Sequence, residues 1–241
     1  MQAEIARVAR LTTMGQMAAS IAHEINQPLA AVVNNANAGL RWLDHQPPNV
    51  ERTRSTLMRI VNDGGRASEV IASIRAMLTK GSQARAQLDI NDLTREVMTL
   101  VRGELQRRGV SIQTGLAAEL PRLSGNRVQL RQVLLNLIMN AAEAMAPITD
   151  RARMLYVRSH SPDHQGVVVT VQDTGPGINE ADMDRIFETF FTTKPEGMGM
   201  GLSICRSIVE AHGGRITASR ANPHGSVFQV VLPVDEPTKS A

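Results

Sequence analysis

Apolar and small residues recur alternately three and four positions apart through the first 43 residues of the chain. The series runs Val8, Leu11, Gly15, Ala18, Ala22, Ile25, Leu29, Val32, Ala36, Gly39 and Leu43. Residues at this spacing share one face of a helix, so the pattern predicts a long helix packed along a narrow seam. A second series with the same alternation runs Leu57, Ile60, Gly64, Ala67, Ile71, Ile74 and Leu78. The first third of the chain therefore predicts two long helices.

The stretch "DHQPPN" separates the two series. Pro47 and Pro48 cannot continue the first helix, and Asn49 is a residue type that caps helix N-termini. We therefore expect an antiparallel helical hairpin over residues 1–82. Two helices of this length cannot close a core alone, so the hairpin predicts a homodimer in which two copies form a four-helix bundle.

The stretch "SIAHEINQPLAA" interrupts the first helix. If Ala22 and Ile25 are buried, His23 and Glu24 face solvent, and Pro28 removes the helical hydrogen bond to the carbonyl of residue 24. A proline within a helix bends it. On this stretch alone, a functional histidine and an ordinary surface histidine beside a tolerated kink are equally open.

The bulk composition is that of a globular protein. Of 241 residues, 42% are hydrophobic and 20% charged, which argues against disorder. Aromatic residues make up 2%, so the core is expected to be aliphatic, and three of the four phenylalanines cluster within residues 187–191. The single cysteine, Cys205, excludes an intramolecular disulfide and is expected to be inert core.

Charge and hydropathy exclude two classes of partner. Residues 1–82 carry nine Lys or Arg against six Asp or Glu, and residues 83–241 carry seventeen of each. This small basic excess contains no basic run, so direct contact with nucleic acid is not expected. No apolar run reaches the roughly 18 residues of a membrane span, so we expect no membrane contact by this segment.

The pattern changes after a short linker at residues 83–86. Strand-like runs are "AQLDI", "VSIQTGL", "MLYVRSHS", "VVVTVQD", "GRITASR" and "SVFQVVLP". Helical stretches near residues 91–108, 126–146 and 199–213 alternate with them. The pattern predicts an α/β sandwich of mixed strand order over residues 87–236. The sequence has neither a P-loop motif nor a strand followed by G-x-G-x-x-G.

Two motifs in this second part place polar groups where a ligand could use them. Asn136 and Asn140 lie four apart on a helix that is otherwise aliphatic, so each needs a partner, either a cation or ligand or a neighbouring loop. Asp173 ends a strand, and Gly175 and Gly177 follow it. This pattern allows the backbone to approach a ligand while the carboxylate accepts a hydrogen bond, although alone it could be a turn.

Two further motifs follow. The run "IFETFFTTK" sets Phe187, Phe190 and Phe191 beside Lys194, and its simplest alternative is a small satellite core. The run "GMGMGLSI" sets its glycines directly before a helix, where backbone N–H groups could hold phosphate. Its candidate residues are Gly197, Gly199, Gly201 and Leu202. A glycine-rich loop alone indicates little.

The order and spacing of these four motifs after a hairpin with an exposed His-Glu pair resemble the transmitter region of sensor histidine kinases of two-component systems. The resemblance runs from about residue 10 to residue 232. It implies a dimerisation and histidine-phosphotransfer hairpin, followed by an ATP-binding domain of the type shared with the Hsp90, gyrase and MutL ATPases. It also implies autophosphorylation of a histidine from ATP and transfer of the phosphoryl group to an aspartate of a response regulator receiver domain.

The resemblance implies a role for each motif. His23 resembles the phosphoacceptor, and Glu24 the residue that takes a proton from its other ring nitrogen. Asn140 matches the Mg²⁺-binding asparagine, with Asn136 lining the same site. Asp173 resembles the residue that recognises adenine, with Gly175 and Gly177 giving the base room. Candidates for the phosphate tail are Lys194, Gly197, Gly199, Gly201 and Leu202, and the phenylalanines together with the segment 191–198 resemble a mobile lid hinged by glycines.

Three positions depart from the common pattern of the family. Gln27 stands where many members have Thr or Asn, which puts dephosphorylation of the partner regulator in doubt. Glu143 stands where many have Lys or Arg, and Asn126 where Asp is commoner. We expect neither Glu143 nor Asn126 to touch the reaction centre.

Two alternatives remain. One is a kinase-like ATP-binding module that signals without phosphotransfer, and the other is a clamp-type ATPase that hydrolyses nucleotide; the His-Glu hairpin argues against the second. We expect the segment to be cytoplasmic, with a sensor region, and any membrane anchor of the parent protein, lying upstream of residue 1.

Overall fold

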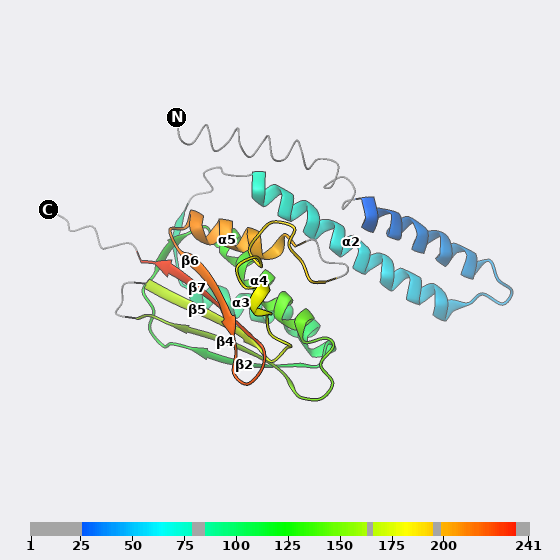
Figure 1. Cartoon of the computed structure of the whole chain (residues 1–241). Helices are drawn as coiled ribbons and strands as arrows, with labels where there is room; N and C mark the ends of the chain where they lie inside the picture. The colour runs from blue at the N-terminus through cyan, green and yellow to red at the C-terminus, as the bar shows by residue number, and fades with distance from the viewer. Residues whose placement is uncertain (1–25, 79–84, 163–165, 195–198, 235–241) are drawn as a thin grey trace. The chain divides into compact units, whose positions relative to one another are not determined.

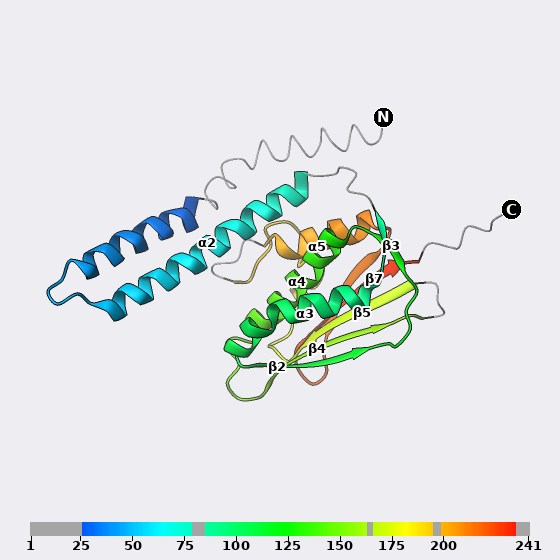
Figure 2. The ribbon, with the colours of Figure 1, turned by 180° about the vertical axis from the view of Figure 1, so that it is seen from behind.

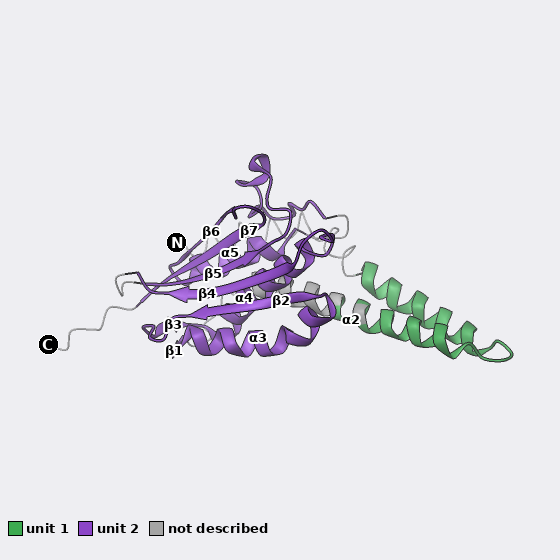
Figure 3. Cartoon of the chain, turned by 90° about the horizontal axis from the view of Figure 1, so that it is seen from below, with its two compact units in different colours: residues 1–79 green, residues 80–241 purple. Residues whose placement is uncertain are grey.

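A computed structural model describes residues 26–78, 85–162, 166–194 and 199–234 of the chain. The chain divides into two compact units, residues 1–79 and residues 80–241, which Figure 3 shows in different colours. Each unit has its own secondary structure and is described by itself below.

The first unit is a hairpin of two helices in its described part. One helix covers residues 26–43, and α2 covers Val50–Leu78. The Asn49 side chain accepts a hydrogen bond from the backbone N–H of Arg52 at 3.0 Å, which confirms the predicted cap. The guanidinium of Arg52 in turn lies 4.4 Å from the ring centre of Trp42, so a cation–π contact links the two helices next to the loop.

Small and polar residues, rather than large apolar ones, join the two helices of the hairpin. A Cβ on Gly39 would lie 2.9 Å from Oγ1 of Thr56, so only a residue without a side chain fits there. One turn away, Nδ2 of Asn35 donates to Oδ2 of Asp63 at 3.0 Å, and Asp63 is buried. Many large apolar side chains in the described part of the hairpin are instead exposed: Leu29, Val33, Leu40, Leu43, Val50, Leu57, Met58 and Val61.

The second unit is an α/β sandwich. Its strands are β1 (Ala86–Leu88), β2 (Val110–Leu116), β3 (Leu123–Gly125), β4 (Arg153–His160), β5 (Gly166–Asp173), β6 (Arg215–Arg220) and β7 (Ser226–Pro233). Its helices are α3 (Ile90–Arg107), α4 (Arg127–Ala144), α5 (Gly201–Ala211) and the short 3-10 helix η1 (Glu180–Asp182).

The main sheet has five strands in the order β2-β4-β5-β7-β6. The pair β2 and β4 is parallel, and the other pairs are antiparallel. Figures 1 and 2 show α3, α4 and α5 on one face of this sheet. Strands β1 and β3 form a separate two-stranded ribbon. The predicted fold class, a helical hairpin followed by a mixed α/β sandwich, is therefore confirmed.

The core of the second unit is aliphatic, as the composition predicts. Strand β5 is buried along nearly its whole length. It is the central strand of the sheet, and its run "GVVVTVQ" lies between β4 and β7. Helix α4 buries Leu137, Ile138 and Ala142 completely. It packs against the sheet on one side and against α3 and α5 on the others, so its position is fixed from several directions.

A buried histidine joins the end of α5 to the start of α4. The Nδ1 of His212 lies 2.7 Å from the carbonyl oxygen of Ile208, and its Nε2 accepts a hydrogen bond from the backbone N–H of Asn126 at 3.0 Å. The ring must therefore be neutral, with its proton on Nδ1. The Asn126 side chain accepts from the N–H groups of Val128 and Gln129, which caps α4 and explains this residue structurally.

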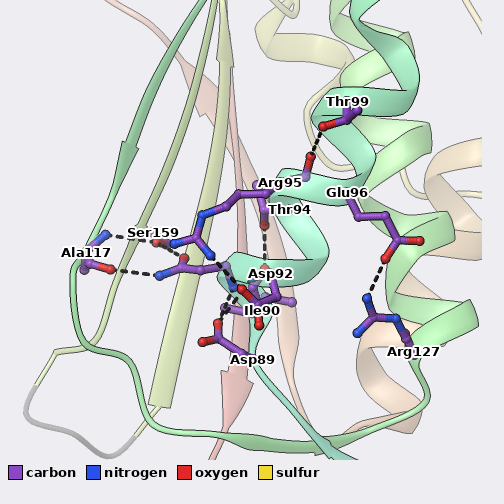
Figure 4. Close-up of polar contacts among 11 residues, drawn as sticks. Asp89, Ile90, Asp92, Thr94, Arg95, Glu96, Thr99, Ala117, Arg127 and Ser159 are labelled. Atoms are coloured by element: carbon purple, nitrogen blue, oxygen red, sulfur yellow. Dashed lines mark hydrogen bonds and ion pairs between the residues drawn. The ribbon is translucent and has the colours of Figure 1, made fainter.

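A buried amide fixes the start of α3 to the sheet. Nδ2 of Asn91 donates to the carbonyl oxygen of Ala117 at 2.8 Å, and the Ser159 hydroxyl donates to Oδ1 of Asn91 at 2.7 Å. Figure 4 shows Ala117 and Ser159 on the sheet side of this network.

At the far side of α3, the carboxylate of Glu96 binds the guanidinium of Arg127. Hydrogen bonds from Arg127 and Arg131 hold the pKa of Glu96 below its ordinary value.

None of the helices in the described ranges is both long and apolar enough to cross a membrane. The sequence patterns predict six of the seven strands and all three long helices of the second unit. They miss β3 and η1, each of which is only three residues long.

Replacing Asn91 with alanine should destabilise the second unit by about 2 kcal/mol, because the change leaves a partly buried carbonyl and a buried hydroxyl without this partner. The Tm of the second unit should fall by roughly 5 °C in calorimetry. Arg95→Ala is the matched control, since its ion pair with Asp92 is exposed at both ends and contributes less than about 1 kcal/mol. Equal losses in the two variants would contradict the role given to Asn91.

Candidate functional site

Three of the predicted site residues, His23, Glu24 and Gly197, lie outside the described residues. The remaining candidates all belong to the second unit. They come from the end of β5, from α4, and from the segment before α5.

Asp173 is a buried carboxylate at the end of β5, 2% exposed. Its Oδ1 accepts two backbone hydrogen bonds, from Gly175 at 2.7 Å and from Ser226 at 3.2 Å. Burial raises the pKa of Asp173 above its ordinary value, and the hydrogen bonds from Gly175 and Ser226 oppose part of that rise. Both backbone donors act on one oxygen, so within the described part of the chain Oδ2 has no backbone donor.

Gly175 is required by the same geometry. A Cβ at this position would lie 2.8 Å from Oδ1 of Asp173 and 3.3 Å from the backbone of Ala144 at the end of α4. Any side chain would therefore push the loop away from the carboxylate that it supports. The loop of residues 173–177, called the base loop below, thus lies directly against the last turn of α4.

The two asparagines of α4 have different partners. Nδ2 of Asn136 donates to the carbonyl oxygen of Gly201 at 3.4 Å, so this amide is bonded to a neighbouring loop, as one of the two sequence interpretations expects. Oδ1 of Asn140 accepts from the ammonium of Lys194 at 3.3 Å. A Cβ on Gly201 would lie 3.6 Å from Nδ2 of Asn140. The structure therefore brings Asn136, Asn140, Lys194 and Gly201 together.

Glu143 contacts this group as well, through Lys194; that it does not touch the reaction centre itself stays a prediction. Its Oε2 lies 2.5 Å from Nζ of Lys194, and both side chains are about half exposed. Asn140 and Glu143 are three residues apart, so they share one face of α4 and hold the same ammonium. Position 143, where the family resemblance leads us to expect Lys or Arg, is thus a glutamate here. This glutamate binds the ammonium of Lys194 from another segment.

The segment before α5 is held at its two ends. The N–H of Phe190, which has a φ of 70°, donates to the carbonyl oxygen of Gly199 at 3.0 Å. Gly199 has a φ of +64°, and a Cβ there would lie 2.5 Å from the backbone of Phe190. Phe187 packs edge-on against Phe228 of β7, with ring centres 6.5 Å apart, so at least one of the three phenylalanines belongs to a satellite core.

Helix α5 begins without a side-chain cap, because its N-cap residue is Met200. The first N–H groups of a helix have no partner within the helix, and a phosphate can accept from them. Gly201 and Leu202 occupy this first turn, next to Asn136 and Asn140. The arrangement can therefore hold an anionic group between α5 and α4.

Cys205 is buried next to Asn136, and its thiol donates to the carbonyl oxygen of Val133. It is fully buried, and burial raises the pKa of its thiol to about 12. A thiol that stays protonated at neutral pH is a poor nucleophile. The expectation of an inert core cysteine is confirmed.

A divalent cation at this site would depend on oxygen atoms of the ligand. The described residues contain no group of three or more His, Cys, Asp or Glu side chains that could hold a metal ion. Mg²⁺ is commonly bound through one or two protein oxygens together with substrate phosphates. The amide oxygen of Asn140 and the carboxylate of Glu143 are donors of this kind, so the residues fit such an ion.

Sequence reasoning missed three contributors to the site: Ser226, Glu143 and Arg151. Ser226 and Asp173 are 53 positions apart and meet only because β5 pairs with β7. The guanidinium of Arg151 donates to the carbonyl oxygens of Thr174 and Gly175. No local motif in the sequence marks Ser226 or Arg151 as a site residue. For Glu143, the one available signal was its negative charge at a position where a cation was expected.

Two family models match the chain. The model described as "His Kinase A (phospho-acceptor) domain" matches residues 13–83, and the one described as "Histidine kinase-, DNA gyrase B-, and HSP90-like ATPase" matches residues 125–236. Among curated proteins, the sensor histidine kinase TmoS of Ectopseudomonas mendocina is 39% identical over 97% of this chain. The sensor protein FixL of Bradyrhizobium diazoefficiens is 37% identical, also over 97%. The chain spans only 24% and 46% of the lengths of these two relatives.

Solved structures give the same family. The catalytic domain of histidine kinase ThkA is 34% identical, with a TM-score of 0.55, and the match covers 61% of this chain and 96% of that domain. Histidine kinase ThkA in complex with the response regulator protein TrrA is 28% identical, with a TM-score of 0.73, and the match covers 99% of this chain and 67% of that one. The chain belongs to the sensor histidine kinases and comprises a transmitter region of that family, with a phospho-acceptor part followed by an ATPase part.

Proposed function

We propose that this chain phosphorylates His23 from Mg·ATP and passes the phosphoryl group to an aspartate of a response regulator receiver domain. In this proposal, residues 1–82 are the dimerisation and phosphotransfer hairpin, and residues 87–236 are the catalytic ATP-binding domain. Family membership supports the reaction class. The observation that carries the nucleotide part is the buried carboxylate of Asp173, with both backbone donors on Oδ1.

Asp173 is proposed to recognise the amino group of adenine. A carboxylate accepts hydrogen bonds and donates none when ionised, so Oδ2 suits an exocyclic amino group and disfavours a carbonyl oxygen at the same position. Burial strengthens this preference, because an unmatched buried acceptor is costly. Gly175 and Gly177 give the base room beside the carboxylate.

The phosphate tail is proposed to lie between α4 and the start of α5. Asn140 would contribute its amide oxygen to Mg²⁺, with Asn136 lining the site, and the metal would supply charge neutralisation along the phosphates. Lys194 and the N–H groups of Gly197, Gly199, Gly201 and Leu202 would hold the phosphate oxygens. The contact of Lys194 with Asn140 supports this grouping, because it places these two side chains next to each other.

His23 is proposed as the acceptor and Glu24 as its base. A neutral imidazole, the form that predominates at pH 7 for an ordinary histidine, has a ring nitrogen free to attack the terminal phosphorus. Glu24 would take the proton from the other ring nitrogen as the phosphoramidate forms. Because ATP is the phosphoryl donor, the same proposal puts this segment in the cytoplasm.

A receiver domain is the proposed acceptor of the phosphoryl group from His23. The relative ThkA has been solved in complex with a response regulator protein, which supports a partner of this class. Gln27 differs from the residue type associated with dephosphorylation of the regulator, so the forward transfer is the activity that we propose for this chain.

The hairpin is proposed to dimerise. Its large apolar side chains are exposed in the single chain, for example Leu40 at 61% and Val61 at 72%. An apolar surface of this kind on a two-helix hairpin is stabilised when a second copy covers it and completes a four-helix bundle.

Replacing His23 with glutamine should abolish acid-labile labelling of the chain by [γ-³²P]ATP, because glutamine has no nucleophilic ring nitrogen. His45→Gln is the matched control, since His45 is an exposed histidine of the same unit whose ring contacts only neighbours in its own segment within the described structure, the Arg41 carbonyl and Trp42. Labelling that survives in His23→Gln would contradict the proposal. Free phosphate release without labelled wild-type protein would favour a clamp-type ATPase, and ATP binding with neither would favour a signalling module.

Replacing Asp173 with asparagine should weaken ATP binding by about 10- to 100-fold, because one buried charge-assisted hydrogen bond is lost and a donor then faces the adenine amino group. The same variant should raise the free energy of unfolding at pH 7. The raised pKa of Asp173 means that the folded wild-type protein favours the protonated carboxyl. The stability that the wild-type protein gains from this protonation is present in acid and is lost as pH rises through the pKa of the folded state.

Calorimetric titration with ATP and unfolding in denaturant at pH 7 and pH 4 test both parts of this prediction. The stability gain of Asp173→Asn should be smaller at pH 4 than at pH 7. An unchanged affinity for ATP would remove Asp173 from the base site, whereas an unchanged stability would contradict only the cost assigned to its burial.

Introducing a charge at Leu40 or Leu57 should convert a dimer into a monomer, because each side chain is exposed in the single chain and would be buried by the proposed partner. Light scattering should then report a fall from twice 26.2 kDa to 26.2 kDa for Leu40→Glu. Arg54→Glu, at an exposed polar position of α2, should remain dimeric. A wild-type chain that is monomeric at high micromolar concentration would contradict the proposal.

A further inference from the structure

We propose that Arg151 is a positioning residue for the base loop and thereby a determinant of adenine specificity. The inference rests on the proposed ATP site and deepens it. Arg151 lies in the connection between α4 and β4, and its side chain is largely buried, 26% exposed. Its Nε donates to the carbonyl oxygen of Thr174 and its Nη2 to that of Gly175, each at 3.0 Å.

The first of these bonds connects Arg151 to Asp173 through a single peptide group. The carbonyl of Thr174 and the N–H of Gly175 belong to the same peptide unit, and that N–H donates to Oδ1 of Asp173 at 2.7 Å. The guanidinium and the carboxylate therefore hold opposite ends of one rigid plane. A charged donor at the carbonyl also polarises the peptide, which strengthens its N–H as a donor to the carboxylate.

The second bond fixes the next peptide plane. The guanidinium is planar, so two of its N–H groups point in fixed relative directions, and they engage the two successive carbonyls of the base loop. Gly175 has no side chain to limit its dihedral angles, so the loop needs an external restraint at this residue. Lysine could supply the charge but not this paired geometry.

The remainder of the base loop is already anchored, which makes the contribution of Arg151 specific. The Thr174 hydroxyl donates to the carbonyl of Ala152 and accepts from the N–H of Met154, both at 2.9 Å. These bonds attach Thr174 to the start of β4 without fixing the peptide that follows. The orientation of that peptide sets where Oδ1 is held, and hence where Oδ2 meets the base.

Arg153 supplies a matched control. It is also an arginine that donates to two carbonyl oxygens, those of Ile148 at 2.9 Å and Arg108 at 2.7 Å. Neither acceptor belongs to the base loop or touches a proposed nucleotide ligand. Loss of Arg153 should therefore reduce stability without changing base recognition.

The test compares Arg151→Lys and Arg151→Ala with Arg153→Lys and Arg153→Ala in the full chain. Dissociation constants for ATP and GTP are measured by calorimetric titration, and the KM and kcat of His23 labelling are measured with ATP. Arg151→Lys should raise the dissociation constant for ATP roughly tenfold and that for GTP much less, so the ATP-to-GTP preference falls. KM should rise by more than kcat falls.

A chemical rescue separates positioning from general packing. Guanidinium ion at low millimolar concentration should restore ATP affinity to Arg151→Ala, and an equal concentration of sodium chloride should not. If Arg151→Ala does not fold, Arg151→Lys carries the test, because it keeps the charge and the aliphatic stem. Both Arg153 variants should keep the wild-type ATP-to-GTP preference even where their Tm falls.

The outcomes distinguish this inference from the proposed function. A wild-type chain that does not bind ATP would overturn the proposed function. A wild-type chain that prefers ATP, together with Arg151 variants that keep this preference and lose only Tm, would overturn the inference alone. A loss of preference in the Arg153 variants equal to that in the Arg151 variants would also overturn it, since the effect would then be general to the α4–β4 connection.

Discussion

The site depends on holding a carboxyl group in a buried position. Asp173 at 2% exposure has lost most of its hydration, and its raised pKa expresses that cost. The protein offsets part of the cost with two backbone N–H groups on one oxygen. Within the described residues this arrangement leaves the other oxygen without a backbone donor, which supports the proposed recognition of a ligand that donates. Stability is thus lost at the position proposed for recognition, a compromise often found in functional sites.

The fold supports this loop from three directions that are distant in sequence. Ser226 arrives because β7 pairs with β5, Gly175 packs against the last turn of α4, and Arg151 reaches back from the connection that follows α4. The β5–β7 pairing is one of the two antiparallel pairs made by the central strand β5, so it is expected to be among the last contacts to open. The base loop therefore follows directly from the central strand of the sheet.

The sequence predicts elements and local contacts well, because these follow from periodicity and capping chemistry. Strand β7 has the predicted bounds, and the cap predicted at Asn49 forms. Contacts between distant segments could not be predicted. Asn136 and Asn140 share one motif, yet one binds a loop carbonyl and the other a lysine. A pattern identifies polar residues that need partners, but only the fold decides which partner is near.

Helix α4 explains why the separate motifs form one site. Along its length it carries Asn136 beside the start of α5, Asn140 and Glu143 beside Lys194, and Ala144 beside Gly175. Asn136, Asn140 and Ala144 are each four residues apart, so they follow one face of the helix, and the opposite face is buried at Leu134, Ile138 and Ala142. A rotation of α4 by one residue would turn this face by about 100° and separate all three contacts at once. The apolar packing of the buried face therefore fixes the position of the polar face. His212 accepts from the backbone N–H of Asn126 and so fixes the start of this helix.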